Sequence, residues 1–232
     1  MSTTLGFDVY GTLIDTNGVV AALQKYIGNK AGDFSQTWRN KQLEYSFRRS
    51  LMQNYEPFAV CTSQALEYTC AVQKVTLTKD QKTEILAGYL TLPAFEDVQK
   101  GLTRLKDKGF RLFAFSNGKA DALESLLNHA GIRDLFLGVV SVDDIKAFKP
   151  SPGTYGHFLR QAGATGGNAW LISSNSFDVI GSISAGMKAA WVRRTPQNIF
   201  DPWGIDPTLI VNNLLEMGDR IEKYDSLNPS FS

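Results

Sequence analysis

Short apolar runs alternate with helical patterns from residue 95 onward, and this alternation restricts the possible folds more than any other feature of the chain. One helical pattern, Phe95 to Lys108, follows Pro93 and stops at Gly109, and another covers Ala120 to Ala130. Strands separated by helices indicate a parallel sheet with helices on both faces, so we expect an α/β protein. The predicted strands are Leu5 to Phe7, Arg111 to Phe115, Leu137 to Ser141, Ala169 to Ile172, Ala189 to Val192 and Thr208 to Val211.

Residues 15 to 92 carry a different pattern. Long segments such as Ser35 to Gln53 and Phe58 to Val75 have helical periodicity without the alternation of a strand. We therefore expect an all-helical cap domain, residues 15–92, inserted into a core that consists of residues 1–14 and 93–232. The tail from Asp225 to Ser232 is rich in Ser, Asn and Pro, and we expect it to be poorly ordered.

Polar clusters follow four of the apolar runs, and three of them stand directly at predicted strand ends, where an α/β sheet exposes its chemistry. Asp8 opens the first cluster, residues 116–118 (Ser-Asn-Gly) form the second, Lys149 lies in the third, and residues 173–178 form the fourth. An aspartate before a Gly-Thr pair is by itself most often a polar residue that opens a turn. Four clusters in this order indicate a catalytic centre instead.

This ordered set resembles the haloacid dehalogenase (HAD) superfamily, whose members use a strand-end aspartate as nucleophile, a Ser or Thr after the second strand, a lysine and a final acidic cluster. The match to the L-2-haloacid dehalogenases is closer still and covers essentially the whole chain. The resemblance implies an HAD-like fold with a Rossmann-like core and a homodimer. It also implies hydrolysis of short-chain (S)-2-haloacids to (R)-2-hydroxy acids with inversion. The residues that carry it are Asp8, Thr12, Arg39, Ser116, Asn117, Lys149, Tyr155, Ser173, Ser174, Asn175, Phe177 and Asp178.

Asp8 is the expected nucleophile. An ionised carboxylate held in line with a carbon–halogen bond would attack the carbon, form an ester and release halide. Tyr10 occupies the position where phosphate-cleaving relatives carry a second aspartate that protonates the leaving group. Because halide leaves as a stable anion, the reaction needs no such acid. Thr12 and Ser116 could orient the carboxylate of Asp8, although each alone would more often be a helix cap.

Two cations are expected to manage the charge of the reaction. Lys149 offers a point charge that could neutralise the carboxylates of Asp8, Asp178 and the substrate. Arg39 is permanently charged and weakly hydrated, which suits it to the leaving halide. The alternatives are a solvated surface lysine and an exposed arginine.

The remaining halide and substrate contacts follow from the resemblance. Asn117 and Phe177 would complete the halide cradle, one through a hydrogen bond and the other through its positive ring edge. Tyr10, Leu43 and Phe58 match positions that line the substrate side chain in the L-2-haloacid dehalogenases. Ordinary core packing is the alternative for these three.

Hydrolysis of the Asp8 ester requires a water molecule that is positioned and deprotonated. Asp178 is the best candidate for the base, with help from Asn175 and Lys149. Ser173 could hold the substrate carboxylate or orient the base. The resemblance places Tyr155 in the catalytic set as well.

A magnesium-dependent HAD phosphatase that acts on a small phosphate ester is the alternative function. Phosphatases of this superfamily usually present two acids four residues apart in the last cluster, whereas this chain keeps Asp178 but has Ser174 in the earlier position. Mg²⁺ would therefore lose an oxygen ligand. Asp143 and Asp144 could substitute for it, but we interpret them as a loop cap and expect neither a metal nor a cofactor. A non-catalytic binding module is the third possibility, because fold alone does not imply activity.

The composition argues against several partners. A net charge of +1 gives no reason to expect nucleic acid or a membrane surface, so a substrate anion must be held by local charge. No run approaches the roughly 18 apolar residues of a membrane helix, and no secretory signal is evident, so we expect a cytoplasmic protein. Cys61 and Cys70 lie about 13 Å apart along one predicted helix, too far for a disulfide.

Overall fold

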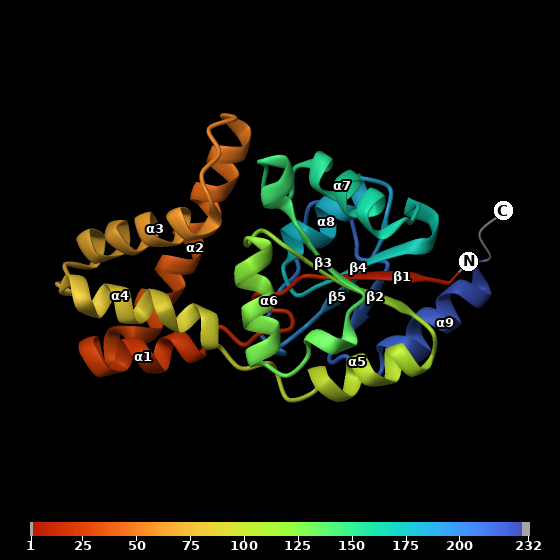
Figure 1. Ribbon diagram of the computed structural model, residues 1–232, viewed down its shortest axis with the longest axis horizontal. Helices are drawn as coiled ribbons and strands as arrows, with labels where there is room; N and C mark the ends of the chain where they lie inside the picture. The colour runs from red at the N-terminus through yellow and green to blue at the C-terminus, as the bar shows by residue number, and fades with distance from the viewer. Residues whose placement is uncertain (1, 229–232) are drawn as a thin grey trace.

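A six-stranded parallel sheet forms the centre of the protein in the computed structural model, which describes residues 2–228 (Figure 1). The strand order is β3-β2-β1-β4-β5-β6, so the first strand of the chain lies inside the sheet. This confirms the α/β class, and the end of each predicted strand differs from the observed end by no more than one residue. The strands are β1 (Thr4–Phe7), β2 (Arg111–Ser116), β3 (Gly138–Ser141), β4 (Ala169–Ser173), β5 (Lys188–Val192) and β6 (Leu209–Val211).

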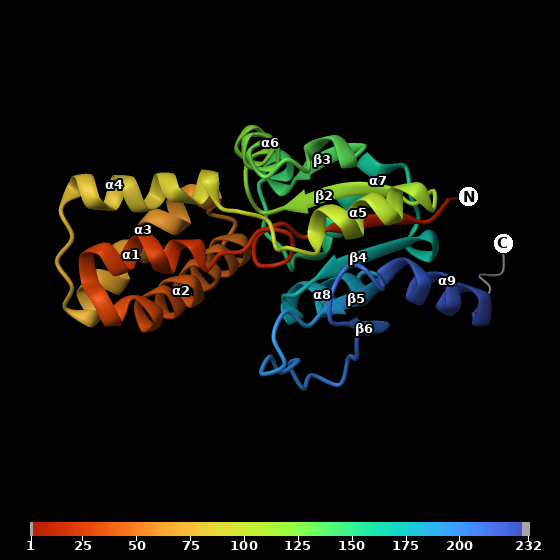
Figure 2. The same cartoon turned by 90° about the horizontal axis from the view of Figure 1, so that it is seen from below.

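Helices cover both faces of the sheet (Figures 1 and 2). Alternate residues of a strand point to opposite faces, and β2 follows this rule. Leu112 and Ala114 pack in one apolar cluster, whereas Phe113 and Phe115 pack in the other. Among the helices that flank the sheet, the first cluster includes residues of α5 (Val98–Asp107), α6 (Ala120–His129) and α9 (Met217–Leu227), and the second includes residues of α7 (Pro152–Ala162) and α8 (Ser176–Ser184).

Two glycines of the first strand region are required by their surroundings. A Cβ on Gly6 would lie 2.5 Å from the ring of Phe158, so only glycine lets α7 approach β1 this closely. Gly11 has a φ of +83°, a conformation that side chains of L-residues rarely adopt. The turn at Gly11 brings Thr12 back toward the end of β1, where its amide donates to the carbonyl of Val9 (3.3 Å).

A helical bundle, which we define as α1 to α4, lies apart from the sheet (Figures 1 and 2). Its helices α2 and α3 pack along each other, and the buried indole of Trp38 on α2 donates to the carbonyl of Thr62 on α3 (2.8 Å). The far end of α2 reaches the sheet region, where the amide of Phe148 donates to Ser50 Oγ (3.2 Å). The bundle consists of α1 (Gly18–Ile27), α2 (Ala31–Leu51), α3 (Phe58–Gln73) and α4 (Lys79–Ala87).

The predicted helices are present, with corrections at their ends. The helix expected from Phe95 begins only at Val98, because the amide of Phe95 donates to the carbonyl of Leu13 (3.0 Å) and ties this segment to the first turn. The expectation of a poorly ordered tail from Asp225 is wrong for residues 225–227, which belong to α9. There the Asp225 carboxylate pairs with Lys188 (2.6 Å). The last four residues of that tail lie outside the described part of the chain.

Two further expectations concern the bundle and the surroundings of the protein. Cys61 and Cys70 are both free thiols buried on α3, as predicted. Within residues 2–228, no helix combines the length and the apolar character needed to cross a membrane.

Candidate active site

The carboxylate of Asp8, directly beyond β1, is held by four donors. Its Oδ2 accepts hydrogen bonds from Asn175 Nδ2 (2.7 Å), Thr12 Oγ1 (2.9 Å) and Ser173 Oγ (3.2 Å). Its Oδ1 accepts from Lys149 Nζ (3.2 Å). The donors come from the turn after β1, the last residue of β4, the segment that follows β4 and the loop before α7, all at the carboxyl edge of the sheet. The two oxygens are therefore unequal, since three donors fix Oδ2.

Lys149 lies between two carboxylates and is almost completely buried. Its ammonium donates to Asp178 Oδ2 (2.8 Å) and the carbonyl of Phe115 (2.8 Å) as well as to Asp8. Tyr155 donates its hydroxyl proton to the other oxygen of Asp178 (2.8 Å). These contacts show why this lysine is not the solvated surface residue that an isolated Lys-Pro pair would suggest.

The electrostatics of this buried group follow from its contacts. Burial alone would lower the pKa of Lys149, but the carboxylates of Asp178 and Asp8 outweigh it and raise that pKa. Burial raises the pKa of Asp178 to about 6, although Lys149 and the hydroxyl of Tyr155 oppose this shift. Burial also raises the pKa of Tyr155 well above its usual range. At neutral pH the lysine is therefore charged, the tyrosine is protonated and Asp178 is ionised.

A small cavity of about 20 Å³ adjoins Asp8. A space of this size holds about one water molecule. Four of the predicted site residues are not part of this lining. Thr12 and Ser173 bond to Asp8, Asp178 bonds to Lys149, and Tyr155 bonds to Asp178. The lining residues are Asp8, Tyr10, Arg39, Leu43, Phe58, Ser116, Asn117, Lys149, Asn175 and Phe177.

The wall opposite Asp8 comes from the bundle. Arg39 on α2 lines the cavity and donates from Nη1 to Gln42 Oε1 (2.7 Å). On the sheet side, Asn117 accepts the amide of Lys149 at its Oδ1 (2.9 Å), which leaves its amide nitrogen as the end that can donate. Phe177 packs edge-on against Phe47 of α2, with ring centroids 5.0 Å apart. A guanidinium, an amide and an aromatic ring thus share one cavity with the carboxylate.

Ser116 contributes in a different way from the expectation that it orients Asp8. Its Oγ accepts the amide of Gly118 (3.3 Å) and so stabilises the turn after β2. The serine lines the cavity without a direct hydrogen bond to Asp8 among the contacts of the described residues.

A comparison with protein families decides the affiliation. The model of the haloacid dehalogenase-like hydrolases matches residues 3–186 of the chain. The chain belongs to this family. Within the haloacid dehalogenase-like hydrolases, it is 33% identical to an (S)-2-haloacid dehalogenase of Pseudomonas sp. (strain YL), and the alignment covers 94% of each chain. It is also 35% identical to haloacetate dehalogenase H-2 of Moraxella sp. (strain B), over 82% of this chain and 85% of that protein.

Solved structures of L-2-haloacid dehalogenases are also similar to this chain over nearly its whole length. The L-2-haloacid dehalogenase of Xanthobacter autotrophicus, with chloropropionic acid covalently bound, superposes with a TM-score of 0.89 at 28% identity. The similarity covers 96% of this chain and 99% of that one. A second structure, of the L-2-haloacid dehalogenase RSc1362, gives a TM-score of 0.91 at 28% identity, over 95% of this chain and 99% of that one.

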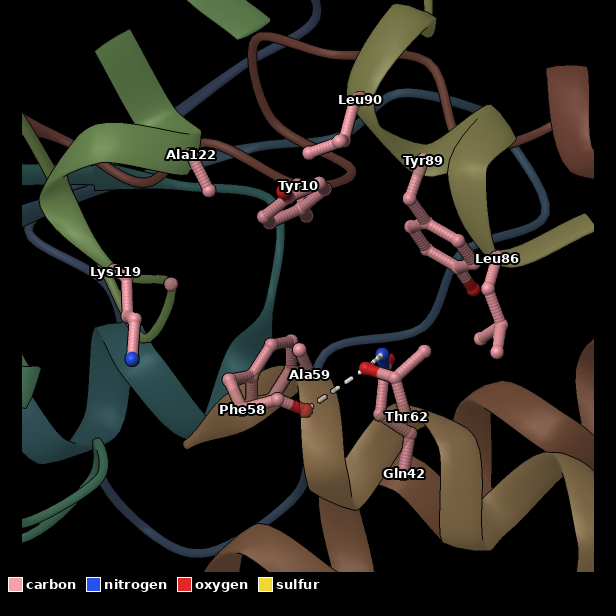
Figure 3. A pocket seen from close by; sticks show the side chains of 11 residues that line it. Tyr10, Gln42, Phe58, Ala59, Thr62, Leu86, Tyr89, Leu90, Lys119 and Ala122 are labelled. Atoms are coloured by element: carbon pink, nitrogen blue, oxygen red, sulfur yellow. Dashed lines mark hydrogen bonds between the residues drawn. The ribbon is translucent and has the colours of Figure 1, made fainter. Parts of the chain in front are cut away.

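A larger apolar cleft of about 250 Å³ lies beside the small cavity, and Tyr10 and Phe58 line both (Figure 3). Figure 3 shows Tyr10 and Leu90 on one side of the open space and Phe58 and Thr62 on the other. Burial and the neighbouring Tyr89 raise the pKa of Tyr10 to about 12. The residue in the acid position of this haloacid dehalogenase-like hydrolase is therefore a neutral, weakly acidic phenol.

Ser174 has a structural function that the sequence reasoning missed. Its amide donates to Thr12 Oγ1 (2.9 Å) and its hydroxyl donates to the carbonyl of Gly11 (2.7 Å). The serine thus fixes the hydroxyl that binds Asp8. Its position three residues before an expected halide contact was visible in the sequence, but nothing there indicated the partner on the first turn.

The two acids considered as substitute metal ligands lie in a surface turn. Asp143 accepts from the hydroxyl of Tyr55 (2.5 Å) and pairs with Lys146 (2.9 Å), while the side chain of Asp144 is 59% exposed. Its neighbour His157 is buried and contacts the carbonyl of Ser141 (3.1 Å), which is a packing role. Residues 2–228 contain no cluster of three or more His, Cys, Asp or Glu that could hold a metal ion.

Proposed function

We propose that this protein is an (S)-2-haloacid dehalogenase that hydrolyses short-chain (S)-2-haloacids to (R)-2-hydroxy acids and halide. The observation that carries this function is the unequal treatment of the two Asp8 oxygens. Three donors hold Oδ2, while Oδ1 accepts a hydrogen bond from Lys149 alone among the described residues. Asp8 and Arg39 line the same cavity. One oxygen is thus anchored and the other is placed to attack.

In the first half-reaction, Oδ1 of Asp8 attacks the carbon that bears the halogen. The new carbon–oxygen bond forms as the carbon–halogen bond breaks, so the carbon inverts and the bonding pair leaves with the halide. Arg39 and Asn117 stabilise the departing anion, since both can direct N–H groups into the cavity. Leu43, Phe58 and Phe177 supply the apolar part of the lining.

In the second half-reaction, water adds to the carbonyl carbon of the Asp8 ester. The negative charge then develops on Oδ2, where the side chains of Thr12, Ser173 and Asn175 already donate. Such preorganised donors form an oxyanion hole, which is where most stabilisation of acyl transfer arises. Asp178 accepts the proton of the attacking water, and the hydroxy acid leaves as Asp8 is restored.

Loss of charge on Asp8 prepares this second step. Lys149 donates to both Asp8 and Asp178 before the reaction. An ester oxygen is a weaker acceptor than a carboxylate oxygen, so in the ester intermediate Lys149 interacts mainly with Asp178. Tyr155 holds the second oxygen of Asp178 and keeps the carboxylate oriented. Both residues thus act on the base rather than on the substrate.

The residues used in this mechanism come from two parts of the chain, which we interpret as a cap domain and a core domain. We propose residues 15–92 as the cap domain and residues 1–14 and 93–232 as the core. The helical bundle stands apart from the sheet in both views and carries Arg39, Leu43 and Phe58, while the other lining residues come from the sheet side (Figures 1 and 2).

The phosphatase alternative is opposed by two residues. Tyr10, with its pKa of about 12, would be a poor acid for an alcohol leaving group. The position of the usual second metal ligand is occupied by Ser174, which has no carboxylate and donates its hydroxyl proton to the carbonyl of Gly11.

The deciding experiment measures halide release from each enantiomer of 2-chloropropanoate in the presence of a chelator, with Asp8→Asn as the control. We expect release from the (S) enantiomer alone and none from the variant. Single turnover in ¹⁸O-water should label the carboxylate of Asp8 and leave the hydroxyl of the first product unlabelled. Phosphate release that depends on magnesium, without halide release, would establish the phosphatase instead.

We also propose that two copies associate and that the protein is cytoplasmic. An apolar groove of about 670 Å³ is lined by residues of α2, of α8 and of the loop after β5. Two of its lining residues, Leu51 and Trp203, are 85% and 74% exposed. Exposed apolar patches of this kind mark interaction sites. Sedimentation analysis should give a dimer, and Leu51→Glu should shift it to the monomer; a monomeric native protein would contradict the association.

A further inference from the structure

A polarised chain of hydrogen bonds runs from Arg39 into helix α3. Gln42 lies three residues after Arg39 on α2, on the same face of the helix, and is 1% exposed. Arg39 Nη1 donates to Gln42 Oε1 (2.7 Å), and Gln42 Nε2 donates to Thr62 Oγ1 (2.5 Å). Thr62 Oγ1 in turn donates to the carbonyl of Phe58 (2.9 Å). Figure 3 shows the last two groups meeting at the edge of the apolar cleft.

The order of donors fixes which end of the Gln42 amide faces Arg39. A threonine hydroxyl has one proton, and Thr62 gives it to the carbonyl of Phe58, so Thr62 can only accept from Gln42. The amide nitrogen must therefore face Thr62 and the amide oxygen must face Arg39. The reversed amide would place its NH₂ against a guanidinium, which has donors and no acceptor.

The neighbouring helix holds Thr62 in place. Trp38, one residue before Arg39, donates its indole N–H to the carbonyl of Thr62 (2.8 Å). Trp38, Gln42 and Thr62 are all buried, so a broken link would leave polar groups without water. The chain of hydrogen bonds thus links the guanidinium of Arg39 on α2 to the backbone of α3.

The neutrality of Gln42 matters as much as its geometry. A carboxylate at this position would form an ion pair with Arg39 and compete with an anion in the cavity. The amide oxygen of Gln42 orients the guanidinium of Arg39 without neutralising its positive charge. We propose that Gln42 and Thr62 are positioning residues that hold Arg39 toward the cavity with its charge reserved for the departing halide. The inference rests on the function proposed above for Arg39.

The test separates halide release from ester hydrolysis in single turnover, with 2-chloropropanoate and 2-bromopropanoate as substrates. Gln42→Met and Gln42→Glu should each slow halide release by about tenfold or more, since small misplacements of catalytic groups can cost about 100-fold. Chloride is the poorer leaving group, so its release should slow more than that of bromide. Hydrolysis of the Asp8 ester should keep its rate, because Arg39 has no part in it.

A matched pair of variants on α3 controls for general damage to the bundle. Thr62 and Thr69 are both buried and both donate to the carbonyl four residues earlier, but Thr62 alone of this pair accepts from Gln42. Thr62→Val should reproduce the chloride-selective defect, Thr62→Ser should restore the native rate, and Thr69→Val should leave the ratio of chloride to bromide rates unchanged.

Two outcomes would overturn the proposal. One is an equal effect of Thr62→Val and Thr69→Val, and the other is a uniform slowing of both halides together with ester hydrolysis. Failure of the proposed function itself is distinguishable, because the native protein would then release no halide from either substrate.

Discussion

The sheet side and the bundle side of the site hold their residues in different ways. Asp8, Lys149 and Asp178 are at most 9% exposed, and each has two or more hydrogen-bond partners in the described chain. Arg39 is half-buried, and its described hydrogen bond goes to Gln42. The proposed nucleophile and the residues proposed for hydrolysis of its ester therefore lie at the carboxyl edge of the sheet. The cation proposed to stabilise the leaving halide is carried by a helix of the bundle. Substitutions on the two sides should thus damage different half-reactions.

The largest effect is expected on the bundle side. Arg39→Met removes the only guanidinium among the described cavity residues, so the charge that develops on the halide loses its main stabilisation. We expect halide release to slow by about 1,000-fold, the upper range for loss of one electrostatic contact in a transition state. Rapid-quench measurement of halide should show this, with Arg48→Met, an exposed arginine of the same helix, as the control. A normal halide burst in Arg39→Met would contradict the comparison.

The complementary change on the sheet side should block the second half-reaction. Asn175→Ala removes the shortest hydrogen bond to Asp8 Oδ2, so the oxyanion of ester hydrolysis loses one of three donors. We expect ester hydrolysis to slow by about 100-fold, typical for one oxyanion-hole donor. Intact-protein mass spectrometry should then detect the alkylated enzyme, which Arg39→Met should not accumulate. Equal slowing of both steps would show that Asn175 serves attack as well.

A stability prediction tests the rigidity of the sheet side. Gly6→Ala would place a Cβ against the ring of Phe158, and overpacking of this kind costs about 1–3 kcal/mol of unfolding free energy. Chemical denaturation should measure the loss. Gly32→Ala on α2, where a Cβ meets nothing within 4 Å, is the matched control and should not destabilise. An unchanged midpoint in Gly6→Ala would mean that α7 can move away from β1.

The smallest expected effect is a shift in pH dependence. Asp178 must be ionised to accept a proton, so ester hydrolysis should decline as the pH falls through its pKa of about 6. The hydroxyl of Tyr155 lowers that pKa, and Tyr155→Phe should therefore move the acid limb to higher pH. The sign for stability is opposite. Burial raises the pKa of Asp178 from its ordinary value of 3.8 to about 6, so the native state binds this proton more tightly and loses stability as the pH rises through that interval. An acid limb that Tyr155→Phe does not move would remove Asp178 from the role of base.

The sequence was most informative where local pattern alone determines structure. Apolar runs with glycine or polar residues at their ends predict the strands to within one residue. Because parallel strands end at one edge of the sheet, the same runs place Asp8, Lys149 and Asp178 together.

Contacts between distant side chains could not be predicted in this way. Ser173 was expected near the substrate carboxylate or the base, yet its hydroxyl donates to Asp8, since rotamers choose among acceptors that lie within a few ångström. The link from Gln42 to Thr62 depends on how two helices face each other across a loop, which periodicity does not fix.

Because Ser50 contacts Phe148, helix α2 sets the distance between the two positive charges of the site, Arg39 and Lys149. Ser50 lies eleven residues after Arg39 on α2, which is about 16 Å along the helix axis at 1.5 Å per residue. It contacts Phe148, the residue directly before Lys149. Each residue added within this length would turn Arg39 by about 100° around the helix axis relative to that tie. A single insertion or deletion in this segment would therefore point the guanidinium away from the cavity, even if every side chain that contacts the site were kept.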